Sequence, residues 1–84
     1  MSATKFVFKI KVSCPDLIPL IAQELTDWTN SQIKTGWLAH GYVNLFTELE
    51  FFIRSNNPLS DLQMSQITSI VNKYDCTFTQ TSIK

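Results

Sequence analysis

The sequence is poor in the residues from which catalytic and metal-binding sites are usually built. It has one histidine, two cysteines and two glycines among 84 residues. Cys14 and Cys76 form no CxxC pair and have only His40 between them, so a structural zinc site lacks ligands. Gly36 and Gly41 stand alone and form no glycine-rich phosphate loop. We therefore expect no enzyme activity, no metal site and no bound cofactor.

An excess of charge is also missing. Seven basic side chains balance seven acidic ones, so the chain lacks the overall positive charge typical of proteins that bind duplex nucleic acid. No segment approaches the roughly 20 apolar residues that cross a bilayer. The first residues lead into a strand-like run without a signal-peptide core. These features predict a cytoplasmic protein with no membrane segment.

The composition is that of one folded domain. Hydrophobic residues make up 44% of the chain and charged residues 17%, which suits a packed core and is unlike a disordered chain. A chain of this length is expected to form a single domain with a thin core. We therefore predict one α+β domain over residues 1–84.

Local patterns place the elements at both ends of the chain. Residues 5–12 alternate between apolar and mostly basic side chains, which predicts a half-buried strand. Ser13, as a cap before a proline, marks the start of a helix over about residues 15–31, with apolar side chains at three- and four-residue spacing. A second helix should begin at Ser60, with Gln63 completing a capping box.

The segment between the two helices decides the architecture. As sheet, it forms two strands joined by a turn near residues 44–47. One side then carries Val43, Leu45, Leu49, Phe51 and Ile53, and the other carries Tyr42, Glu48, Glu50, Phe52 and Arg54. As helix, residues 44–55 align Leu45, Leu49, Phe52 and Ile53. We favour strands because the segment is rich in strand formers and because the helix would expose Phe46 and Phe51.

With two strands there and a last alternating strand over residues 76–83, the order is strand, helix, strand, strand, helix, strand. This is the ferredoxin-like split βαβ arrangement, a four-stranded antiparallel sheet with both helices on one face. Its usual strand order (fourth, first, third, second) would bring Cys14 near Cys76, and whether these thiols are bonded stays open. A helical segment over residues 44–55 would instead give a mostly α small domain.

The predicted sheet has an open face opposite the helices, and this face is our candidate site. Its apolar middle, surrounded by charged side chains, is typical of an interface, unless side-chain stems cover it. Catalysis there is a weaker interpretation, because His40 has no identifiable partner and Glu48 and Glu50 suit ordinary cross-strand ion pairs. The candidate partner-binding residues are Val7, Lys9, Lys11, Leu38, His40, Tyr42, Phe52 and Arg54.

We therefore predict a non-enzymatic protein–protein interaction module, such as an adaptor, inhibitor or small subunit. It would bind a protein partner, or a second copy of itself, through the open sheet face or an edge strand. The alternative is a single-stranded RNA or DNA binder, in which basic side chains contact phosphates while Phe52, Tyr42 and His40 stack on bases. A steep fall of affinity with salt would favour the alternative.

Overall fold

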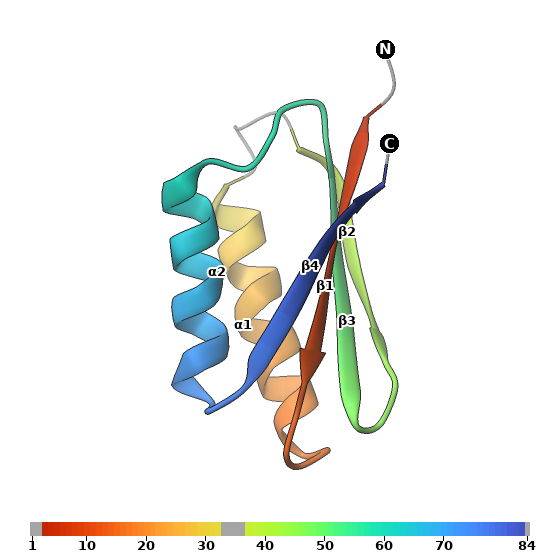
Figure 1. Cartoon of the computed structure of the whole chain (residues 1–84), viewed down its shortest axis with the longest axis vertical. Helices are drawn as coiled ribbons and strands as arrows, with labels where there is room; N and C mark the ends of the chain where they lie inside the picture. The colour runs from red at the N-terminus through yellow and green to blue at the C-terminus, as the bar shows by residue number, and fades with distance from the viewer. Residues whose placement is uncertain (1–2, 33–36, 84) are drawn as a thin grey trace.

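The computed structural model describes residues 3–32 and 37–83 as a four-stranded antiparallel sheet with two helices on one face (Figure 1). The elements follow the predicted order, which confirms the ferredoxin-like α+β fold. The helical alternative for residues 44–55 is wrong, because these residues form the end of one strand, a turn and the next strand. The bounds are β1 (Thr4–Lys11), α1 (Leu17–Ser31), β2 (Trp37–Asn44), β3 (Glu48–Ser55), α2 (Asp61–Lys73) and β4 (Thr77–Ile83).

The strands lie in the order β2-β3-β1-β4, so β1 and β3 are central and β2 and β4 are the edges. β1 pairs with both neighbours without a register shift, whereas the β2–β3 pairing shifts between Trp37 and Ala39. The last strand lies beside the first, as predicted. Cys14 and Cys76 are free thiols, the first exposed and the second buried.

The core lies between the sheet and the helices. Alternate residues of β1 and β3 point into it, as the sequence alternation predicted, and α1 contributes one apolar face. The ring of Phe78 in β4 meets that of Phe8 edge to face, with centroids 5.7 Å apart. The largest fully buried apolar side chains are Phe8, Phe51, Ile10, Ile18, Ile21, Leu25, Leu49, Ile53, Ile67 and Val71.

Helix α1 begins later than predicted, and Ser13 is not its cap. The residue before the helix is Asp16, whose side chain makes no capping hydrogen bond. The N–H of Leu17 instead donates to the carbonyl of Cys14 at 3.0 Å, and that of Ile18 to the carbonyl of Pro15 at 3.1 Å. The chain therefore enters the helix through tight backbone turns of the 3₁₀ kind, which replace the side-chain cap.

Helix α2 begins as the sequence predicted. Ser60 Oγ accepts a hydrogen bond from the N–H of Gln63 at 3.1 Å, and Gln63 Oε1 accepts one from the N–H of Ser60 at 2.9 Å. This capping box satisfies two N–H groups at the helix start. Among the residues that the structure describes, no helix has the length and apolar character needed to span a bilayer.

The turn between β2 and β3 lies where the sequence predicted it. The N–H of Leu45 donates to the carbonyl of Glu48 at 2.8 Å, and Asn44 Oδ1 accepts a hydrogen bond from the N–H of Phe46 at 2.9 Å. Phe46 has a positive φ of 73°. This is the pattern of a short hairpin loop that contains one residue in the left-handed conformation.

This turn sets which side of the sheet each residue of β2 faces. The hairpin closes on the pair Asn44 and Leu49, so even-numbered residues of β2 lie opposite odd-numbered residues of β3. Tyr42 therefore shares the helix side with Phe51, and Val43 lies on the open face. The predicted phase of β2 was wrong by one residue, and a shift of one residue reverses the direction of every side chain in a strand.

Candidate functional site

The open face of the sheet carries most of the predicted charged contact residues. Lys9 lies opposite Glu50, and Lys11 lies opposite Glu48, in the pairing of β1 with β3. Both lysines are exposed, as is Arg54 on the same face of β3. Opposite charges on facing strands favour each other. The structure thus brings Lys9, Lys11 and Arg54 together on one face, where basic side chains are mixed with Glu48 and Glu50 and exceed them in number.

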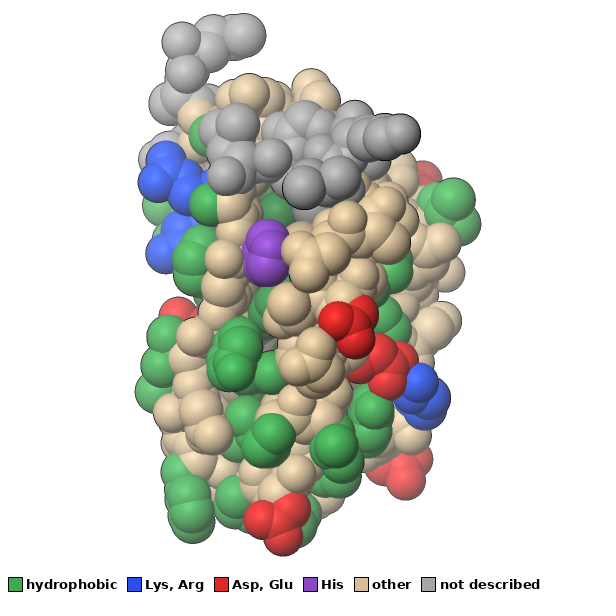
Figure 2. All heavy atoms as spheres, turned by 180° about the vertical axis from the view of Figure 1, so that it is seen from behind, with side chains coloured by type: hydrophobic (Ala, Val, Ile, Leu, Met, Phe, Trp, Pro, Cys, Tyr) green, Lys and Arg blue, Asp and Glu red, His purple; other side chains and the backbone are tan. Residues whose placement is uncertain are grey.

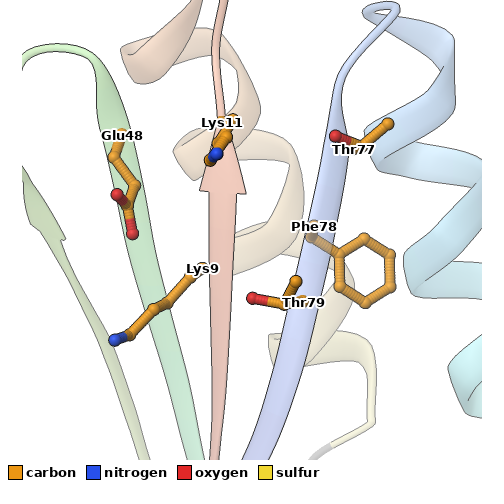
Figure 3. A pocket seen from close by; sticks show the side chains of 6 residues that line it. All are labelled: Lys9, Lys11, Glu48, Thr77, Phe78 and Thr79. Atoms are coloured by element: carbon orange, nitrogen blue, oxygen red, sulfur yellow. The ribbon is translucent and has the colours of Figure 1, made fainter.

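A hollow of about 320 Å³ lies over β1 on this face. Figure 3 shows the side chain of Lys9 reaching toward β3, the strand of Glu48, while the ring of Phe78 points away toward α2. The lining of the hollow combines ammonium, carboxylate and hydroxyl groups with about as much apolar surface. Its lining residues are Lys9, Lys11, Glu48, Thr77, Phe78 and Thr79.

The predicted apolar middle of the open face is covered by side chains and is not accessible to a partner. Val7 points to this face but is only 4% exposed, so the prediction that it is available to a partner was wrong. Phe52 is half-buried and lies against Gly41 of β2, where an added Cβ would be 2.8 Å from its Cε1 atom. Lys5 Nζ lies 4.8 Å from the centroid of the same ring. The Phe52 ring and neighbouring stems thus cover the sheet, which was the alternative that the sequence left open.

His40 and Tyr42 were predicted on the open face and lie on the other side. His40 is opposite Ile53 and Tyr42 is opposite Phe51, and both are exposed; Figure 2 shows the histidine at the surface. The His40 ring stacks on that of Phe51, with centroids 6.5 Å apart. Both residues lie on the side opposite to the prediction because the turn sets a register that differs from the predicted one by one residue. The side chain of Leu38 lies outside the described residues.

A group of exposed apolar side chains, which we call the hairpin patch, lies at the end of β2 and in the turn. Phe46 is 69% exposed, Tyr42 and Val43 are 50% exposed, and Leu45 is 47% exposed. In Figure 2, hydrophobic side chains gather over the lower half of the molecule, the end where Figure 1 places the hairpin and the start of α1. The sequence interpretation missed this patch, although an apolar Leu45-Phe46 pair at a predicted turn is unusual.

A cluster of Glu24, Lys73 and Tyr74 joins the two helices. Glu24 pairs with the Lys73 ammonium and accepts a hydrogen bond from the Tyr74 hydroxyl at 2.7 Å. The hydrogen bonds from Lys73 and Tyr74 lower the pKa of Glu24. The hydrogen bond to Glu24 raises the pKa of Lys73 and that of Tyr74. These interactions link α1 to α2, so we assign the cluster a structural role.

Replacing Glu24 by glutamine should destabilise the protein more at neutral than at acid pH. A carboxyl group whose pKa is lowered by folding stabilises the fold above its unfolded pKa of about 4.3, and this contribution is lost as the pH falls through the folded pKa. The raised pKa values of Lys73 and Tyr74 affect stability only at alkaline pH, where the contributions of these groups to the free energy of unfolding are lost as the pH rises. Urea unfolding of the wild type and of Glu24→Gln at about pH 7 and about pH 3 measures how much free energy of unfolding the variant loses at each pH. Equal differences at the two pH values would contradict the assignment.

The described residues give no sign of a metal centre. Within residues 3–32 and 37–83, no three His, Cys, Asp or Glu side chains are placed to hold an ion together. Comparisons with protein-family models, with curated proteins and with solved structures gave no match. The function must therefore be argued from the surfaces described above.

Proposed function

We propose that the protein is a non-enzymatic interaction module that binds a protein partner through the hairpin patch at the edge of its sheet. The observation that carries this proposal is the exposure of four large apolar side chains within residues 42–46. Tyr42 lies on the helix side and Val43 on the open face, so the patch covers both sides of the hairpin end. Exposed apolar side chains gathered in this way on so small a domain are typical of a contact site. Aromatic side chains are the types most enriched among residues that dominate binding energy.

The backbone of Phe46 supports the same proposal. A non-glycine residue in the left-handed conformation costs about 1–3 kcal/mol, and Phe46 adopts it with φ 73°. The exposed ring buries little surface in return, so the stability of the isolated fold does not account for a phenylalanine at this position. A ring held at the tip of a hairpin is well placed to enter a pocket of another protein.

The nucleic-acid alternative is less well supported. Its three stacking residues lie on two sides of the sheet, with Phe52 on the open face and His40 and Tyr42 on the helix side. A single strand that follows one face would not stack on all three. For location we propose the cytoplasm, because the free thiols of Cys14 and Cys76 fit a reducing compartment.

Replacing Phe46 by glycine tests the proposal by separating stability from binding. Glycine adopts a positive φ without strain, so the variant should be at least as stable as the wild type, with a gain of up to about 1 kcal/mol. It should also bind the partner at least about tenfold more weakly, since it removes the most exposed ring of the patch. Urea unfolding measures the stability. Affinity purification from the native host, followed by titration of the purified partner, measures the binding.

Asp75 offers a matched control. It also has a positive φ, 58°, and it follows α2, far along the chain from the hairpin. Asp75→Gly changes the same kind of backbone position but leaves the hairpin patch intact, so partner binding should be unchanged. A partner that binds Phe46→Gly as tightly as the wild type would contradict the proposal.

A further inference from the structure

The outer edge of β4 is an unprotected strand edge. Among the described residues, β4 pairs only with β1 and forms one end of the sheet, and six of its seven residues are exposed. Natural edge strands are usually guarded by charges, prolines, bulges or short length. β4 has no charge and no proline between Thr77 and Ile83, and its register with β1 is unbroken. The opposite edge, β2, has a register shift between Trp37 and Ala39.

The β4 sequence is suited to pair with a second copy of itself. If two β4 strands run antiparallel about a two-fold axis at Gln80, Thr79 lies opposite Thr81 of the second copy, and residues on each face of the sheet meet residues of the same face. Thr77 then lies opposite Ile83, an exposed apolar side chain. Because Thr77 lines the hollow of Figure 3, Ile83 of the second copy would lie beside that hollow. No like charges face each other along this pairing.

Helix α2 leaves room for the same arrangement. Gln66 accepts a hydrogen bond from Trp28 of α1 at 2.9 Å, and Lys73 pairs with Glu24 of α1, so these residues mark the flank of α2 that faces α1. Thr68 follows Gln66 by about 200° around the helix, so it lies on the flank away from α1, and α2 is the helix that packs against β4. Only Lys73 and Asp75 are charged between Leu62 and Ile83, so two α2 helices could approach without repulsion.

We propose that two copies of this chain form a dimer by antiparallel pairing of their β4 strands, centred on Gln80. The two sheets join into one continuous sheet with all helices on one side. Seven paired residues span about 23 Å, which is a small contact, so the dimer is reversible with a dissociation constant of about 1–100 μM. This inference is independent of the hairpin patch, which lies at the other edge of the sheet.

Charge substitutions at Gln80 test both the dimer and its register. Gln80 is exposed and would face Gln80 of the second copy. Gln80→Lys and Gln80→Glu each place like charges opposite each other, so each variant alone should weaken dimerisation by at least about tenfold. An equal mixture should restore it, because lysine then faces glutamate. Sedimentation equilibrium measures the mass, which should rise with concentration from 9.6 kDa toward twice that value for the wild type.

The controls carry the same charges on α1, the helix that packs against β2 and β3. Asn30 is exposed on α1, and Asn30→Lys and Asn30→Glu should leave dimerisation unchanged. A wild type that stays at 9.6 kDa up to about 1 mM overturns the dimer. Gln80→Lys and Gln80→Glu variants that dimerise as tightly as the wild type overturn the β4 interface. A mixture of the two that stays monomeric overturns the register.

Discussion

Replacing Phe51 by alanine should destabilise the fold by about 3–5 kcal/mol. Phe51 is fully buried and lies in a central strand, opposite Phe8 on one side and Tyr42 on the other. Its ring also stacks against that of His40. Removing it leaves a cavity in a core that is already thin for so short a chain. Because small domains have about 5–15 kcal/mol of stability in total, this loss is a large fraction of the free energy of unfolding.

The measurement is the free energy of unfolding in urea, for Phe51→Ala and for Phe46→Ala. Both changes remove the same atoms from the same hairpin, but Phe46 is 69% exposed. Its replacement should alter stability by no more than about 0.5 kcal/mol. The contrast isolates burial from residue type. Similar losses for the two variants would mean that the placement of the hairpin relative to the core is wrong.

Much of the fold could be predicted from local signals. The alternation of β1 and β3 identified their core faces because each strand has one face against the helices. The Ser60 and Gln63 capping box identified the start of α2, since its two hydrogen bonds need only residues three positions apart. Element order then limited the topology, because short connections between these elements favour the ferredoxin-like arrangement.

The orientation of β2 could not be predicted in the same way. Alternation shows which residues of one strand share a side. Which of these sides lies on the same face of the sheet as a given side of the next strand depends on the number of residues in the turn. The turn contains Phe46 in a conformation that glycine or asparagine usually adopts, so the sequence carried no Asn-Gly or Asp-Gly signal for it. Tyr42 and His40 were assigned to the open face for this reason, and two of the three predicted stacking residues are on the helix side.

The burial of Val7 depends on neighbours that are distant in sequence. Alternation correctly placed Val7 on the face without helices, where an apolar side chain is expected to be exposed. The Phe52 ring lies opposite Val7 in the neighbouring strand and occupies the space that a side chain at Gly41 would need, and the Lys5 ammonium lies over the same ring. Such cover becomes visible only when three strands are placed side by side, so sequence periodicity alone does not reveal it.

Replacing Val7 by asparagine should therefore destabilise the fold by about 2–4 kcal/mol, although Val7 lies on the open face of the sheet. Its side chain is 4% exposed, so the change loses apolar burial and places an amide group where it is cut off from water. Asparagine adds no charge, so the lysines that flank the position, Lys5 and Lys9, do not form a new ion pair with it. Urea unfolding measures the loss.

Val43→Asn is the matched control, because Val43 points to the same face but is 50% exposed. It should cost no more than about 1 kcal/mol, the range of strand propensity alone. Equal losses at the two positions would mean that the open face is not covered at Val7. A large loss at Val7 alone would establish that the centre of this face serves the stability of the sheet. Binding would then be left to its edges, where the hairpin patch and the free side of β4 lie.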